Sequence, residues 1–173
     1  MSPLRTDWKN IDTVLLDMDG TLLDLHFDNF FWLHHLPKRY SEQHGIDATV
    51  ALLDLRTLDW YCTDFWSAQF NIDIVDLKRE VLHLVNERPQ VQGFLTALGA
   101  MGKQRILITN AHRNSVDIKF SVTTIEPLLD LVISSHDYGY PKEDQLFWQQ
   151  LQANMPFDPD RTLFIDDSEP VLR

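Results

Sequence analysis

Four short apolar runs, each ending at polar or turn-forming residues, are the strongest constraint on how this chain folds. The runs are Thr13–Leu16, Arg105–Thr109, Leu131–Ser134 and Thr162–Ile165. Short runs of this kind are typical of strands that are buried on both faces. Helical patterns at 112–126 and 143–153 separate the last three runs. This alternation predicts an α/β fold with a doubly wound, Rossmann-like parallel sheet.

The long interval between the first two runs has a different character. Residues 24–87 carry no clear strand signal, and their patterns predict helices. After this interval, a helix at Val91–Met101 is expected to lead the chain back to the second strand of the sheet. The expected helices in the interval are Asp28–His44, interrupted at Pro37, then Asp47–Leu58, a segment around Asp64–Phe70, and Asp73–Glu87.

These patterns predict two domains. We expect a sheet domain at 1–23 and 88–173 and an inserted helical cap domain at 24–87. The chain stops one turn into a helix that Ser168 is expected to cap, so we also expect the sheet domain to be truncated at its C-terminus.

Charge and composition exclude several classes of function. The formal net charge is −11, from 15 basic and 26 acidic residues, and it disfavours nucleic acid and anionic membranes as partners. Cys62 is the one cysteine, so neither an internal disulfide nor a multi-cysteine zinc site is expected. The apolar runs are too short to span a membrane and the N-terminus does not resemble a signal peptide, so we expect a cytoplasmic protein.

The first strand ends in two carboxylates that predict a cation site. Asp17 and Asp19 follow the run directly, and Gly20 and Thr21 come next. Open α/β sheets bind ligands at the carboxyl ends of their strands. Two carboxylates on one strand face repel each other unless the chain turns or a cation lies between them. A hard, oxygen-seeking ion such as Mg²⁺ fits this need.

The other strand ends supply complementary polar groups. They are Thr109-Asn110, Lys142 in the loop after the third strand, and the pair Asp166-Asp167. A carboxylate nucleophile, a cation to screen its approach to phosphate, and a hydroxyl and an ammonium to hold phosphoryl oxygens would form one phosphate-transfer site. Each group taken alone has an ordinary structural explanation, such as a solvated lysine or an acidic helix N-terminus. The prediction therefore depends on the set.

In this order, the motifs Asp17-x-Asp19-Gly20-Thr21, Thr109, Lys142 and Asp166-Asp167 resemble those of the haloacid dehalogenase superfamily, in its phosphatase branch. The resemblance implies that Asp17 forms an aspartyl-phosphate, and that Asp19 protonates the leaving alcohol and then activates water. It also implies a Mg²⁺ site formed by Asp17, Asp19 through its main-chain carbonyl, Asp166 and Asp167, with Asp166 binding directly or through water.

The resemblance assigns the remaining motif residues to the phosphate. It implies phosphate binding by Asp17, Gly20, Thr21, Thr109, Asn110 and Lys142. One departure concerns the lysine loop. Many members carry proline after the lysine, whereas here Pro141 precedes Lys142 and Glu143 follows it, so the loop is expected to differ in shape.

In this superfamily a helical insertion between the first two motifs closes over the site and selects the substrate. Aromatic residues are dense in the insertion and offer faces for stacking a nucleobase, and polar neighbours offer contacts to base edges. They are Phe27, Phe30, Phe31 and Trp32, then Trp60, Tyr61, Phe65 and Trp66, with Asn29 and Asp64 as polar neighbours. The alternative is that these aromatics form the core of a small helical domain.

Longer strings resemble a nucleotidase branch of the superfamily that acts on GMP and IMP. The strings include Trp60-Tyr61-Cys62, Thr109-Asn110-Ala111-His112 and Gly139-Tyr140-Pro141-Lys142-Glu143. The resemblance implies hydrolysis of purine nucleoside 5′-monophosphates, a small-molecule phosphate ester substrate. Two alternatives stay open: a phosphatase or phosphomutase acting on another small phosphorylated metabolite, and a catalytically silent phosphate-binding regulator. Among the histidines, His112 is the one expected near the phosphate.

Overall fold

The computed structural model describes residues 6–45, 63, 67–68 and 71–172, and the chain divides into two compact units. The first unit comprises Met1–Leu22, Arg88–Asn110 and Thr124–Arg173, and the second comprises Leu23–Glu87 and Ala111–Thr123. The inserted segment therefore forms one unit together with 111–123, which the sequence patterns had placed in the sheet domain. The two units are described separately below.

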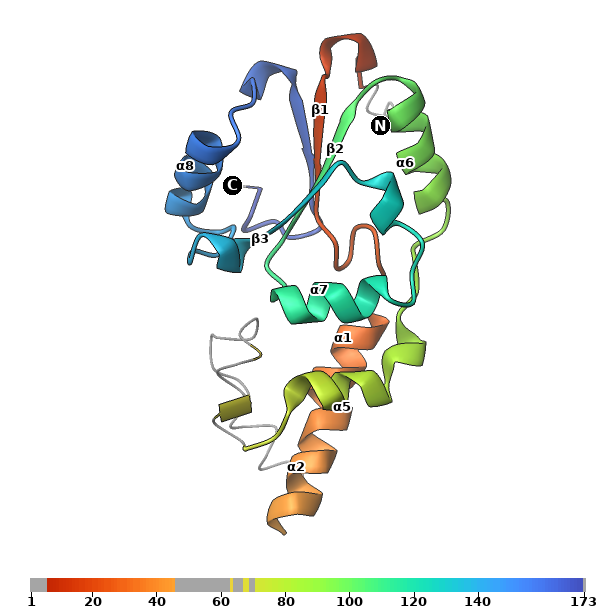
Figure 1. Cartoon of the computed structure of the whole chain (residues 1–173), viewed down its shortest axis with the longest axis vertical. Coiled ribbons are helices and arrows are strands. Elements are labelled where there is room, and N and C mark those ends of the chain that lie inside the picture. The colour runs from red at the N-terminus through yellow and green to blue at the C-terminus, as the bar shows by residue number, and fades with distance from the viewer. Residues whose placement is uncertain (1–5, 46–62, 64–66, 69–70, 173) are drawn as a thin grey trace. The chain divides into compact units, whose positions relative to one another are not determined.

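The first unit contains a fully parallel sheet of four strands in the order β3-β2-β1-β4 within the described residues (Figure 1). The strands are β1 (Thr13–Leu16), β2 (Gln104–Thr109), β3 (Leu131–Ser134) and β4 (Thr162–Ile165). The predicted doubly wound α/β fold is confirmed, and three of the four strands have the predicted bounds.

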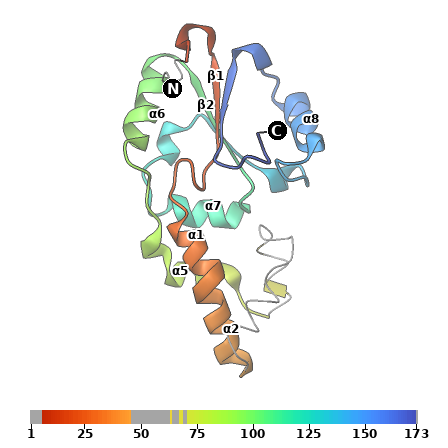
Figure 2. The same ribbon diagram turned by 180° about the vertical axis from the view of Figure 1, so that it is seen from behind.

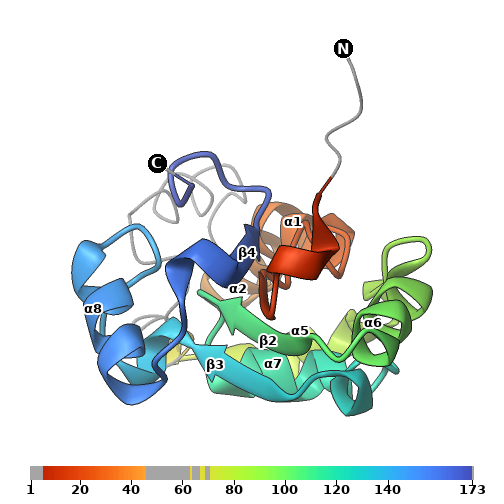
Figure 3. The ribbon, with the colours of Figure 1, turned by 90° about the horizontal axis from the view of Figure 1, so that it is seen from above.

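Helices cover both faces of this sheet. Figure 3 shows α6 (Val91–Ala100) and α8 (Gln145–Asn154) on opposite sides of the strands. Side chains of a strand alternate between the two faces. Leu15 and Ile106 therefore share one face, where they pack against Phe147 of α8 in a buried cluster. This packing fixes the register of the strands and hence the places where they end.

The parallel register brings the strand ends together. Leu16 pairs with Ile165 of β4 and with Leu107 of β2, so the next residue after β1 lies beside the end of β4. The backbone N–H of Asp17 donates to the carbonyl of Ile165 at 2.9 Å. The crossovers lead to opposite sides of β1, so β1 and β4 flank a topological switch point, which is where open α/β sheets bind ligands.

The second unit is helical. Its elements are α1 (His26–Phe30), the π-helical turn η2 (Phe31–His35), α2 (Leu36–His44), α5 (Ile74–Glu80), the 3₁₀ turn η3 (Leu82–Leu84) and α7 (Arg113–Phe120). The first three run on without a break as one rod, clearly visible in Figure 2. Pro37, which has no N–H to donate, lies in the first turn of α2, directly after the π-helical turn, so the predicted interruption is a change of helix type and not a break.

Buried lysines connect α7 to the other helices of this unit. The Lys119 ammonium on α7 lies 2.6 Å from Asp28 of α1, and the Lys78 ammonium on α5 donates to Ser115 on α7 at 2.9 Å. Lys78 also lies over the ring of Phe31, 5.3 Å from its centroid. Both lysine side chains are almost fully buried. Through Lys119 and Ser115, α7 is thus joined to α1 and α5, which explains why 111–123 belongs to this unit.

Several predicted helices differ in length. The helix predicted to reach Glu87 ends at Glu80, where Val81 leaves the helical region with φ −115° and a 3₁₀ turn follows. The helix predicted at 112–126 ends at Phe120. The segments Asp47–Leu58 and, for the most part, Asp64–Phe70 lie outside the described residues. The remaining 3₁₀ turns are η1 (Trp8–Asn10), η4 (Glu126–Leu128), η5 (Ser135–Asp137) and η6 (Pro159–Arg161). Within the described ranges, no helix has the length and apolar character needed to cross a bilayer.

Candidate active site

The carboxyl end of the sheet gathers a lysine and a group of aspartates, all within the first unit. The Lys142 ammonium lies 2.6 Å from Oδ1 of Asp17 and 2.6 Å from Oδ2 of Asp166. It also approaches the carbonyl of Ile108 at 3.4 Å. The lysine is 3% exposed and Asp17 is 5% exposed, so this is a buried charge cluster. The sheet register, and not sequence proximity, brings these groups from β1, β4 and the loop after β3 to one place.

Burial dominates the electrostatics of the cluster. It raises the pKa of the Asp17 carboxyl to about 7, against the opposing attraction of Lys142, and Asp166 and Asp19 raise it further. Burial also opposes the charged form of Lys142, but Asp17 and Asp166 outweigh it and raise the pKa of that ammonium. Lys142 therefore stays charged, whereas the charge of Asp17 depends on whether more positive charge is present nearby.

The donor set fits a divalent cation. Carboxylate oxygens of Asp17, Asp166 and Asp167 lie within 4.8 Å of one another. Oδ2 of Asp17 is buried and has no hydrogen-bond partner among the described residues. A buried carboxylate oxygen without a partner is costly and calls for an explanation. A cation held by oxygen ligands would supply the missing partner and stabilise the ionised form of Asp17.

Gly20 is required where the chain passes this acidic group. Its φ of +95° lies in the region that favours glycine, and a Cβ atom there would lie only 2.0 Å from Oδ2 of Asp167. The carbonyl of Gly20 accepts a hydrogen bond from Arg88 at 3.0 Å, which holds the turn. The hydroxyl oxygen of Thr21 is buried and has no partner in the described part of the chain. The turn after β1 thus leaves a second oxygen available to a ligand.

Side chains from the end of β2 shape the loop that carries Lys142. Oδ1 of Asn110 accepts from the backbone N–H of Lys142 at 2.9 Å, and its amide donates to Glu143 at 2.9 Å. The indole N–H of Trp148 donates to the carbonyl of Lys142 at 2.8 Å. Thr109, 1% exposed, lies at the end of β2. The loop with its unusual proline position is therefore held by three side-chain contacts that the sequence patterns did not reveal.

The remaining predicted residues are placed as follows. Asp19 is close enough to Asp17 to raise the pKa of that carboxyl. His112, expected near the phosphate, is in the second unit and caps α7, where its Nδ1 accepts from the N–H of Asn114 at 3.3 Å. Arg88, Glu143 and Trp148 were missed as site-shaping residues. Arg88 directly precedes Pro89, and nothing in the local sequence marks it as a residue of the site.

The first aromatic group of the insertion is mostly core. Phe27, Phe31 and Trp32 are at most 8% exposed and pack with Leu36, Ile74 and Leu77 in the core of the second unit. Phe30 is partly buried against the same cluster, and Asn29 is exposed. For the buried three, the alternative of packing describes the structure better than stacking on a base. Trp60, Tyr61, Asp64, Phe65 and Trp66 lie outside the described residues.

Comparison with known proteins agrees with this architecture. The family model for the haloacid dehalogenase-like hydrolases matches residues 11–170. A crystal structure of a phosphatase of this family from Thermococcus onnurineus superposes with a TM-score of 0.74 at 21% identity, covering 91% of this chain and 78% of that one. At this level of identity, the likeness extends to the fold alone.

Two curated relatives match over most of the chain. The pyrophosphatase PpaX of Anoxybacillus flavithermus is 24% identical over 92% of this chain and 76% of its own length. The GMP/IMP nucleotidase YrfG of Escherichia coli is 44% identical over 95% of this chain and 78% of its own length. The extent of these matches, the parallel sheet and the motif residues at its carboxyl end lead to one assignment. The chain belongs to the haloacid dehalogenase-like hydrolase family, as its motifs predicted.

Proposed function

We propose that this protein is a Mg²⁺-dependent nucleotidase that hydrolyses purine nucleoside 5′-monophosphates. The observation that carries the proposal is Oδ2 of Asp17, a buried carboxylate oxygen with no partner in the described part of the chain, beside the Lys142 ammonium and two further carboxylates. An oxygen of this carboxylate that the described part of the protein leaves unbonded stays open to a cation or to phosphorus. The nucleotide preference rests on the 44% identity to the GMP/IMP nucleotidase.

The proposed reaction has two steps. In the first, the Asp17 carboxylate attacks phosphorus, the bond from phosphorus to the 5′ oxygen breaks, and Asp19 gives its proton to the leaving nucleoside. In the second, Asp19 takes a proton from water, and that water attacks phosphorus and frees Asp17 and inorganic phosphate. Asp17 is thus regenerated, and the net reaction consumes one water.

The remaining residues hold and neutralise the phosphate in this proposal. Lys142, whose pKa the neighbouring carboxylates raise, stays cationic and binds a phosphoryl oxygen. Thr109, with Asn110 beside it, and the turn at Gly20 and Thr21 would bind the other oxygens. Asp17, Asp166 and Asp167, with the carbonyl of Asp19, would hold Mg²⁺. When bound, Mg²⁺ would screen the repulsion between carboxylate and phosphate.

The inserted segment 24–87 is proposed to act as the cap that selects the substrate. An acidic, monomer-sized nucleotide fits the proposal better than a polymer does, because the net charge of −11 repels a polyanion. The cytoplasmic location expected from the sequence is part of the same proposal.

A substrate panel tests the assignment. Phosphate release from GMP, IMP, AMP, UMP and sugar phosphates is measured with Mg²⁺ and again with a chelator, using Asp17→Asn as the control for the mechanism. We expect Mg²⁺-dependent release that is fastest with the purine nucleotides and absent in the variant. Preference for a sugar phosphate would instead support the metabolite phosphatase, and rates that do not depend on Asp17 would contradict the mechanism.

A further inference from the structure

Lys142 lies at a corner of a turn in the first unit. The backbone N–H of Asp144 donates to the carbonyl of Pro141 at 2.9 Å, so Lys142 and Glu143 are the two central residues of a β-turn. The common turn types differ mainly in the direction of the peptide group between these two residues. A proline after the lysine would restrict its backbone, but the residue that follows is Glu143. The turn alone therefore does not fix the backbone of the lysine.

One side chain holds the peptide group that follows the lysine. The indole N–H of Trp148, on α8, donates to the carbonyl of Lys142 at 2.8 Å. That carbonyl belongs to the central peptide group of the turn, so the hydrogen bond selects one of its directions. The same indole packs edge-on against Phe164 of β4 with the ring centroids 5.0 Å apart, and the lysine ammonium lies 6.0 Å from the centroid of the Phe164 ring. Trp148 thus supports the backbone of the lysine directly and its charged end through Phe164.

Two side chains hold the peptide group that precedes the lysine. Oδ1 of Asn110 accepts from the N–H of Lys142, and Nδ2 of the same amide donates to Oε2 of Glu143, both at 2.9 Å. A carboxylate can only accept hydrogen bonds, so Glu143 keeps the NH₂ group of the amide on its own side and leaves the oxygen for the lysine N–H. If the amide turned over, its NH₂ group would face a second donor. Glu143 therefore acts on the lysine through Asn110.

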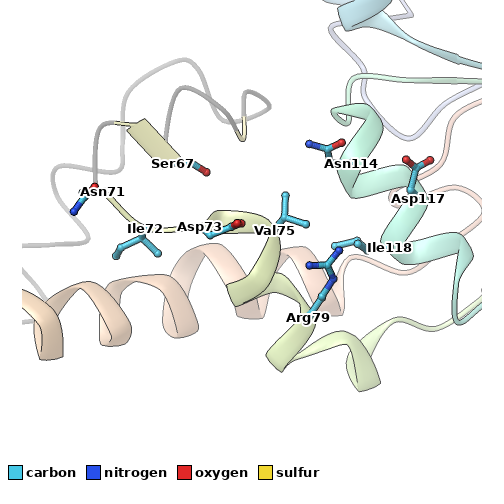
Figure 4. A pocket seen from close by; sticks show the side chains of 9 residues that line it. All are labelled: Ser67, Asn71, Ile72, Asp73, Val75, Arg79, Asn114, Asp117 and Ile118. Carbon is cyan, nitrogen blue, oxygen red and sulfur yellow. The ribbon is translucent and has the colours of Figure 1, made fainter.

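An exposed carboxylate in the second unit shows what distinguishes this contact. Asp76 accepts from Arg79, one of the side chains that line the pocket between α5 and α7 (Figure 4). Both side chains of that pair are more than half exposed, and such pairs contribute little to stability. Glu143 is exposed as well, but its partner Asn110 is 6% exposed and in turn bonds the lysine backbone.

We propose that Trp148 and Glu143 are positioning residues that hold the Lys142 ammonium where it binds a phosphoryl oxygen. The proposal rests on the phosphate role proposed above for this lysine. Its side-chain partners, Asp17 and Asp166, are also the proposed metal ligands, and Asp17 is the proposed nucleophile, so their attraction to the ammonium changes during the reaction. The hydrogen bonds to the two peptide groups do not involve these carboxylates and hold the lysine throughout.

A double-mutant cycle tests this role in the whole chain with Mg²⁺ present. Glu143→Ala and Trp148→Phe are made in the wild-type protein and in Lys142→Met, and kcat/KM is measured with GMP and with p-nitrophenyl phosphate, an ester without a nucleobase. Each change removes one hydrogen bond and is expected to lower kcat/KM about fivefold in the wild-type background, by the same factor with both esters. Neither change is expected to lower kcat/KM further in Lys142→Met, because both residues act through the lysine.

Phosphate binding distinguishes positioning from a simple effect of charge. Removal of the negative charge of Glu143 would by itself strengthen the binding of an anion, whereas loss of positioning weakens it. Calorimetric titration with inorganic phosphate is therefore expected to show weaker binding in Glu143→Ala and recovery in Glu143→Gln, whose amide oxygen can still accept from Asn110. Asp76→Ala is the matched control for the carboxylate, and Trp8→Phe, which changes an indole packed edge-on against Phe94, is the control for the tryptophan. Neither control is expected to alter phosphate binding.

The outcomes separate this proposal from the proposed function. An equal loss of kcat/KM in the Lys142→Met background would overturn the positioning role, because a general structural effect lowers the activity of both backgrounds alike. Unchanged kcat/KM in both single variants, or stronger phosphate binding in Glu143→Ala, would also overturn it, while Asp17-dependent hydrolysis of GMP by the wild-type protein would leave the nucleotidase function intact. Absence of Asp17-dependent phosphate release from either ester would overturn both proposals.

Discussion

Replacing Asp17 by asparagine is expected to stabilise the metal-free protein at neutral pH, although it removes the proposed nucleophile. The carboxylate is buried, and among the residues that the structure describes only Lys142 offsets its charge from within hydrogen-bonding distance. Asparagine has nearly the same shape and carries no charge, so it avoids the cost of ionising this position. The variant therefore measures how much unfolding free energy the buried charge costs, because the packing around the side chain stays nearly the same.

The size of the effect follows from the pKa. Burial holds the pKa of Asp17 at about 7 in the folded protein, against 3.8 for an ordinary aspartate. Because the folded value is the higher one, the folded state binds more protons between these two values. The stability that the proton confers is complete below the lower pKa and is lost as the pH rises through the upper one. Each pH unit in this window costs about 1.4 kcal/mol, so complete ionisation costs about 4 kcal/mol of unfolding free energy.

Urea denaturation with a chelator present measures this cost. Between about pH 5 and about pH 8, the unfolding free energy of the wild-type protein is expected to fall by about 3 kcal/mol relative to that of Asp17→Asn. Mg²⁺ is expected to recover the stability of the wild-type protein at the higher pH and to have little effect on the variant. Identical pH dependence of the two proteins would refute the reasoning, because it would mean that Asp17 ionises in the folded protein as easily as in water.

Three further substitutions test the site and the core. Lys142→Met leaves its carboxylate partners without their cation, so the unfolding free energy in the absence of metal is expected to fall by roughly 3 kcal/mol. The variant's kcat is expected to fall at least about a hundredfold, as for the loss of one stabilising donor, and an unaltered kcat would contradict the phosphate role. Gly20→Ala is expected to weaken Mg²⁺ binding in calorimetric titration because the new Cβ would displace Asp167, whereas Gly139→Ala, also at positive φ but with open space around it, is expected to leave binding unchanged. Phe147→Ala removes a fully buried side chain of the sheet core and is expected to cost about 3 to 5 kcal/mol in urea denaturation; a cost below about 1 kcal/mol would argue against the packing of α8 on the sheet.

The strands were predictable because their signal is local. A short apolar run that ends in polar residues has few ways to be buried, and β1, β3 and β4 have the predicted bounds. Helix ends were less predictable, since they depend on tertiary contacts. The pattern of α5 continues past Glu80, but the backbone leaves the helix at Val81 and a 3₁₀ turn follows.

The candidate site also has a part that the sequence predicts and a part that it does not. The strand-end residues were visible in the sequence because parallel strands must bring their carboxyl ends to one edge, and Asp17, Lys142 and Asp166 are in direct contact there. Their supporting contacts were not visible, because nothing local marks Trp148 as the donor to the lysine carbonyl or Arg88 as the donor to Gly20. The aromatic residues of the insertion allowed two interpretations, a stacking surface for a base or the core of a helical domain. The sequence does not distinguish them, because the difference lies in which side chains are buried in the folded unit.

The buried contacts of α7 have a consequence for protein engineering by recombination. Exchange of the inserted segment 24–87 between relatives is an obvious way to transplant substrate preference. Such a chimera would keep Lys119, almost completely buried, but would replace Asp28, its ion-pair partner at 2.6 Å, and Lys78, the donor to Ser115. Removing one partner of a buried pair costs about 3 to 5 kcal/mol. The exchangeable module is therefore discontinuous, and a functional transplant has to carry 111–123 together with the insertion.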